Sequence, residues 1–196
     1  VLLNLEQMYA DAGDLRAAES SLADLIKHEP DNPDHRLRYA NILIRAEKYR
    51  EATKQLKSVL RENPRNSEAH ILVGTMHLAT NKADRALAAF AKAQKVDPEN
   101  LEIRIHLARA YRSQGEDEKA ISELSFLLET EPKHYSARLL LGELYLQRSL
   151  YSEALALFRE LEEEFPDDQD VLTALVRAYN GLGEQEIAIQ YAERLV

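Results

Sequence analysis

The sequence predicts an all-helical solenoid, in which pairs of antiparallel helices follow one another along the chain. Prolines recur every 34 residues, at Pro30, Pro64, Pro98, Pro132 and Pro166. Six alanines recur at the same spacing, at Ala18, Ala52, Ala86, Ala120, Ala154 and Ala188. A sequence period of about 20–50 residues is typical of solenoids, in which each repeat contacts only its neighbours. The repeat is clearest from Ser67 to Pro98, where two helical patterns flank a short polar turn.

The period divides the chain into six repeats of two helices each, or about twelve helices. The repeats are 1–32, 33–66, 67–100, 101–134, 135–168 and 169–196. The first helices are expected at 1–12, 33–46, 67–80, 101–114, 135–148 and 169–182. The second helices are expected at 15–28, 49–62, 83–95, 117–130, 151–164 and 185–196. The chain lacks an initiator Met and both ends lie inside helical patterns, so we expect a single array excised from a longer protein.

Both ends of the first helices carry recognisable signals. The residues that precede these helices are Asn32, Asn66, Asn100, His134 and Asp168. An Asn or Asp side chain caps a helix by accepting a bond from a backbone N–H of the first turn, so His134 is the weak exception. The turn after the helix has glycine at Gly13, Gly115 and Gly183, and Asn81 tolerates the same left-handed backbone. Glu47 and Ser149 suit it less well, and we expect their turns to be built differently.

Columns of similar residues explain how the helices pack. Small residues recur in the first helices, at Ala40, Gly74, Ala108 and Gly142. Large residues recur in the second helices, at Leu22, Leu56, Phe90, Leu124 and Phe158. A tyrosine column contains Tyr9, Tyr111, Tyr145 and Tyr179, and His77 replaces tyrosine in the third repeat. A small residue at a crossing lets two helices approach toward the short end of the usual 8–10 Å.

With its period, small-residue column, tyrosine column, alanine column and joint proline, the chain resembles a run of tetratricopeptide repeats over its whole length. The resemblance implies a right-handed superhelix whose first helices line a concave groove that binds peptides or proteins. One family feature is absent, the aromatic residue near the start of each repeat. Its place is taken by Leu2, Arg36, His70, Arg104, Arg138 and Leu172. The carboxylate clamp of some family members is also excluded, because Leu72 and Glu102 stand where Asn and Lys are needed.

Composition argues against several other classes of function. The net charge is −9 and no run of five basic residues occurs, which disfavours nucleic acid as the partner. The chain has no Cys, and His70 and His77 are too far apart on one helix to share an ion, so no metal site or cofactor is expected. No nucleophile or phosphate-binding motif is present, so we expect no catalysis. No apolar stretch reaches the ~20 residues that cross a bilayer, and the compartment stays open.

The candidate partner-binding residues lie in the columns that the resemblance places along the groove. They are Leu37, Arg38, Asn41, Arg45, Ile71, Leu72, Thr75, Leu78, Ile105, His106, Arg109, Arg112, Leu139, Leu140, Glu143, Leu146 and Arg177. Arginine is enriched at binding hot spots and pairs with carboxylates through two parallel hydrogen bonds. Two interpretations of the arginines stay open. They could contact a partner in the groove, or Arg109, Glu143 and Arg177, which share one column, could instead form salt bridges between repeats.

The sequence therefore predicts a non-catalytic scaffold that binds a protein or peptide containing apolar and acidic residues. A first alternative is a structural or self-assembly segment of a bacterial envelope, secretion or polysaccharide-export machine. A second is the substrate-recruiting arm of an enzyme whose catalytic domain lies outside this chain. Apolar residues at both ends, such as Leu3 and Ile189, also predict end-to-end self-association.

Overall fold

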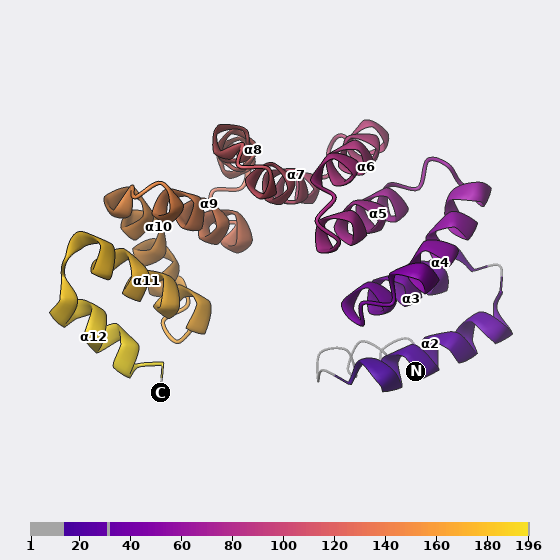
Figure 1. Cartoon of the computed structure of the whole chain (residues 1–196), viewed down its shortest axis with the longest axis horizontal. Helices are drawn as coiled ribbons and strands as arrows, with labels where there is room; N and C mark the ends of the chain where they lie inside the picture. Colours follow the sequence, from indigo (N-terminus) through magenta and orange to yellow (C-terminus); the bar gives the residue numbers. More distant parts are fainter. Residues whose placement is uncertain (1–13, 31, 196) are drawn as a thin grey trace. The chain divides into compact units, whose positions relative to one another are not determined.

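A computed structural model describes residues 14–30 and 32–195, which form eleven α-helices and no strand. The all-helical fold of paired helices is thereby confirmed (Figure 1). The expected helix at 1–12 and the turn residue Gly13 lie outside the described residues. None of the described helices is both long and apolar enough to span a membrane.

The chain divides into two compact units, Val1–His106 and Leu107–Val196. The first unit contains α2 (Leu15–His28), α3 (Pro33–Arg45), α4 (Tyr49–Glu62), α5 (Ser67–Ala79) and α6 (Ala83–Val96). The boundary falls within α7 (Glu102–Ser113). The second unit contains α8 (Asp117–Thr130), α9 (Tyr135–Gln147), α10 (Tyr151–Glu164), α11 (Gln169–Leu182) and α12 (Gln185–Glu193). Apart from the end of α12, each bound lies within one residue of its expected position.

The expected caps are made at the first helices. The Asn66 side chain accepts a bond of 2.7 Å from the backbone N–H of Ala69, and Asp168 accepts one of 3.0 Å from Val171. His134 also caps its helix, because its Nδ1 accepts a longer bond of 3.3 Å from Ala137. The imidazole that accepts at Nδ1 carries its proton on Nε2, so this cap requires the neutral ring.

The expectation of differently built turns in the second and fifth repeats is wrong. Glu47 and Ser149 have φ angles of 59° and 60°, close to the 55° of Asn81 and the 75° of Gly115. In each of these turns the residue with positive φ follows the first helix, and the next N–H bonds back to a carbonyl of that helix, as Lys48 does to Leu43 at 2.8 Å. The geometry of the turn therefore overrides the preference of the residue, at a cost of about 1–2 kcal/mol for a side chain in the left-handed region.

Glycine and alanine in the small-residue column match different partners in the second helix. A Cβ added to Gly74 would lie 2.3 Å from the ring of Phe90, and one added to Gly142 would lie 2.3 Å from the ring of Phe158. Both phenylalanines are fully buried. In the second and fourth repeats the same two positions hold buried alanine and leucine. Because protein interiors are close-packed, a bulky ring in one helix requires the loss of a methyl group in the other.

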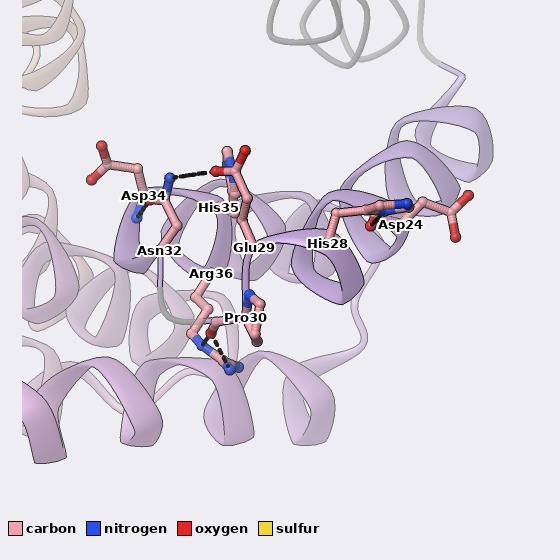
Figure 2. Close-up of polar contacts among 8 residues, drawn as sticks. All are labelled: Asp24, His28, Glu29, Pro30, Asn32, Asp34, His35 and Arg36. Atoms are coloured by element: carbon pink, nitrogen blue, oxygen red, sulfur yellow. Dashed lines mark hydrogen bonds and ion pairs between the residues drawn. The ribbon is translucent and has the colours of Figure 1, made fainter.

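The column that lacks the family's aromatic residue has a structural role at the joints between repeats. Arg36 donates to the carbonyl of Pro30 through Nη2 at 2.7 Å and through Nε at 3.2 Å, as Figure 2 shows. His70 donates from Nε2 to the carbonyl of Pro64 at 2.9 Å, and Arg138 donates to the carbonyl of Lys133 at 3.0 Å. Each of these side chains therefore satisfies a carbonyl of the linker that would otherwise have no helical partner.

Candidate functional site

The seventeen candidate residues differ in how much surface they offer. Five apolar side chains are buried, namely Leu37, Leu72, Ile105, Leu140 and Leu146. Five polar side chains are exposed, namely Arg38, Asn41, Arg45, Arg109 and Arg177. The other seven are half-buried, namely Ile71, Thr75, Leu78, His106, Arg112, Leu139 and Glu143. The buried residues belong to the packing of the helices, so contact with a partner would come mainly from the exposed and half-buried ones.

Five of the candidates meet in the second unit around one hollow of about 340 Å³. We call it the α7–α9 hollow. Its walls are Arg109 and Arg112 from α7, Tyr135, Ser136, Leu139, Leu140 and Glu143 from α9, and Asp170 from α11. Helical spacing explains the arrangement, because residues three or four apart share one face of a helix. The hollow thus combines the side chains of Leu139 and Leu140 with two guanidinium groups and with two carboxylates, those of Glu143 and Asp170.

The two arginines of the hollow have different surroundings. Arg112 forms an ion pair with Glu143 of the next repeat at 2.5 Å, and both side chains are about one-third exposed. Arg109 is exposed and has no ion-pair partner among residues 14–30 and 32–195, and the same holds for Arg177. A salt-bridge ladder through Arg109, Glu143 and Arg177 is therefore not formed, since Glu143 pairs with Arg112 instead. Arg109 remains available to a carboxylate from outside the chain.

A half-buried hydrogen bond holds the start of α9 in place beside the hollow. The Tyr135 hydroxyl donates to Oδ1 of Asp168 at 2.9 Å, and the same oxygen accepts the N–H of Val171 at the start of α11. Burial, followed by the bond to Asp168, raises the pKa of Tyr135 above its ordinary value. The Tyr135 ring also packs edge-on against Phe165, with 5.2 Å between ring centroids. These contacts fix the start of α9 against the start of α11 and so position Leu139 and Leu140 in the hollow.

Several candidates of the first unit have internal partners. The hydroxyl of Thr75 donates to the carbonyl of Ile71 at 3.0 Å, one turn earlier in α5. The His106 ring stacks on the buried Phe90 ring, with 5.2 Å between centroids. Asn41 and Arg45 lie exposed on α3, four residues apart on one face.

Sequence reasoning missed three residues that line the α7–α9 hollow, Tyr135, Ser136 and Asp170. Tyr135 and Ser136 lie one turn before Leu139 and Leu140, which were in the candidate set. Extending that face by one turn toward the start of α9 would have found them. Asp170 lies in the first turn of α11, in the next repeat. Within the described part of the chain, no group of three possible metal ligands occurs.

Comparisons with known proteins agree with this architecture. A family model described as the cytochrome c-type biogenesis protein H TPR domain matches residues 55–172, more than half of the chain. A second model, described as a tetratricopeptide repeat, matches residues 9–75. A search of curated proteins finds no match.

Solved structures of similar proteins share the fold at low sequence identity. PilW, a type IV pilus biogenesis factor, is 21% identical with a TM-score of 0.83, over 98% of this chain and 89% of that one. A TPR protein of Thermus thermophilus is 23% identical with a TM-score of 0.80, over 92% of this chain and 97% of that one. YrrB, a TPR protein with an unusual peptide-binding site, is 18% identical with a TM-score of 0.61, over 89% and 90% of the two chains.

Proposed function

Because the chain belongs to the tetratricopeptide-repeat family, we propose that it is a scaffold that binds a peptide segment of another protein in the α7–α9 hollow. The observation that carries the proposal is the exposed Arg109, which has no ion-pair partner among the described residues and lines the hollow together with the half-buried Leu139. Arginine is among the residues that are enriched at binding hot spots.

The hollow favours a ligand with an acidic residue next to an apolar one. A carboxylate would pair with the Arg109 guanidinium, and a leucine, isoleucine or phenylalanine side chain would cover Leu139. Arg112 contributes in a different way, because it is held by Glu143 and an acidic ligand must compete with that carboxylate. Ser136 offers a hydroxyl that can donate to the ligand backbone. The ligand can be extended or helical. An extended peptide presents every second side chain to the hollow, and an amphipathic helix presents its apolar face.

A displayed library of short random peptides, selected on the whole chain, tests the proposal without a known partner. The selected peptides should be enriched in Asp and Glu next to Leu, Ile or Phe. The variant Arg109→Glu/Arg112→Glu should weaken their binding by a few kcal/mol if the arginines grip desolvated carboxylates. Its melting temperature should change little, because exposed ion pairs contribute only about 0–1 kcal/mol.

A second candidate function is an assembly segment of a cell-envelope machine. The matching family model is named for cytochrome c biogenesis and PilW for pilus biogenesis. The end of the chain also has an exposed apolar residue, Ile189, which is 59% accessible. If Arg109→Glu/Arg112→Glu retains a natural partner while Ile189→Asp loses it, the assembly function replaces the peptide-binding one.

A further inference from the structure

A second hollow lies in the first unit, at the joint between the second and third repeats. It has a volume of about 620 Å³ and we call it the joint pocket. Its lining comes from the end of α4, the linker, the first turn of α5 and the end of α6. The residues are Leu60, Pro64, Arg65, His70, Lys92, Lys95 and Val96. None of them belongs to the α7–α9 hollow or to the candidate set of the sequence analysis.

The joint pocket concentrates positive charge on a protein of net charge −9. Arg65, Lys92 and Lys95 line it, and none of the three has an ion-pair partner among the described residues. Lys92 and Lys95 lie three apart on α6, so both ammonium groups can reach the same side of the helix. Part of the lining is apolar, because it also includes Leu60, Pro64 and Val96. The pocket therefore suits an anionic ligand that also carries an apolar group.

The same position two repeats later contains the carboxylates that the joint pocket lacks. Sixty-eight residues on, Arg65 and His70 correspond to Lys133 and Arg138, while Lys92, Lys95 and Val96 correspond to Glu160, Glu163 and Glu164. There Arg138 is 2% exposed and its Nη1 lies 3.2 Å from a Glu164 oxygen and 3.9 Å from a Glu160 oxygen. Lys133 lies 3.5 Å from the same Glu164 oxygen. In that repeat, carboxylates of the chain itself neutralise the cations of the joint.

In the third repeat, lysines stand in place of two of these three glutamates and valine in place of the third, so the chain supplies no carboxylate to the lining. We propose that the joint pocket is a second docking site, which takes an acidic peptide segment of a partner protein. Two carboxylates of the ligand replace the missing ones, and a neighbouring apolar side chain covers Leu60 and Val96. Carboxylates are the expected ligand groups because, in the fifth repeat, the chain's own glutamates fill the equivalent position.

The test uses a blocked, fluorescently labelled peptide with the sequence 160–165 of this chain, ELEEEF, because this stretch supplies the carboxylates in the fifth repeat. Fluorescence anisotropy measures its binding to the whole chain carrying Arg109→Glu/Arg112→Glu, which removes the α7–α9 hollow as a competing site. Adding Lys92→Glu/Lys95→Glu should weaken binding at least about tenfold, because each lysine becomes a like charge to the ligand. A peptide with glutamine in place of every glutamate should bind as weakly.

The matched control is Lys54→Glu/Lys57→Glu, which makes the same change of net charge with the same spacing on the exposed side of α4. It should leave the affinity within about twofold, because long-range charge effects are screened at physiological salt. Equal losses in the two double variants would overturn the proposal, since binding would then follow net charge alone. A second result would also overturn the proposal. If sedimentation showed that the unlabelled chain self-associates and that Lys92→Glu/Lys95→Glu abolishes this association, the occupant of the joint pocket would be a second copy of the chain.

Discussion

The pairing of Gly74 with Phe90 gives a quantitative test of how the repeats pack. In Gly74→Ala the new Cβ would lie 2.3 Å from the Phe90 ring, so the ring or a helix must shift. Overpacking of a close-packed core costs about 1–3 kcal/mol, and alanine returns about 1 kcal/mol of helix propensity. Three ring atoms lie within 2.7 Å of the new Cβ. We therefore expect the upper end of the cost, a net destabilisation of about 2 kcal/mol.

The double variant Gly74→Ala/Phe90→Leu should recover most of this loss. It recreates the alanine and leucine that the second repeat has at Ala40 and Leu56, both buried. Phe90→Leu alone leaves a cavity and should cost about 1–2 kcal/mol. If the methyl group introduced by Gly74→Ala fills that space, the whole overpacking cost disappears, and the two substitutions should show a favourable coupling energy of about 3 kcal/mol, at the upper end of the range known for residues in contact.

Urea denaturation of the four proteins measures the coupling, with circular dichroism and tyrosine fluorescence as probes of the same transition. The chain has nine Tyr and no Trp, so the fluorescence is that of tyrosine. The control combines Gly74→Ala with Phe158→Leu, the same substitution at a ring that contacts Gly142 instead. That pair should be additive within about 0.5 kcal/mol. If Gly74→Ala and Phe90→Leu were equally additive, the size-matching explanation of the small-residue column would be refuted.

Two further predictions concern the turns and the tyrosine column. Glu47→Gly and Ser149→Gly should each raise the free energy of unfolding by about 0.5–1 kcal/mol in urea titrations, because relief of the left-handed backbone exceeds the entropic cost of glycine. A loss of stability in both would contradict the assigned turn geometry. Burial, followed by the charges of Arg85 and Lys82, lowers the pKa of His77 below its ordinary value of 6.5. The unfolded chain then binds the proton more readily, so stability falls as the pH drops below about 6.5, and His77→Tyr should reduce this acid loss in urea titrations at several pH values. An unchanged pH profile would show that His77 does not contribute.

The sequence period predicted the fold because every level of structure repeats with it. Joint prolines, caps and small residues each restrict one backbone position, and together they placed the helix ends within one residue of those observed, except at the end of α12. The turns at Glu47 and Ser149 were missed because residue preference was judged one position at a time. In the structure, the flanking helices impose the left-handed geometry on whichever residue stands there.

The candidate site was less predictable than the fold. A repeat column places a residue on a helix face, but it does not say which neighbour its side chain reaches. Glu143 shares a column with Arg109 and nevertheless pairs with Arg112, three residues later on α7. The joint pocket was missed for a related reason. Its cations become conspicuous only when the third repeat is compared with the fifth, where Glu160 and Glu164 neutralise Arg138.

The most direct test of the proposed function compares Arg109→Glu with Arg50→Glu. Both arginines are exposed and both substitutions change the net charge equally, but only Arg109 lines the α7–α9 hollow. The measurement is the affinity of the selected acidic peptide for each variant by isothermal titration calorimetry, with melting temperatures recorded alongside. Arg109→Glu should weaken binding about tenfold or more while the melting temperature stays unchanged, and Arg50→Glu should bind as the parent chain does. Equal affinities of the two variants would contradict peptide binding in the hollow.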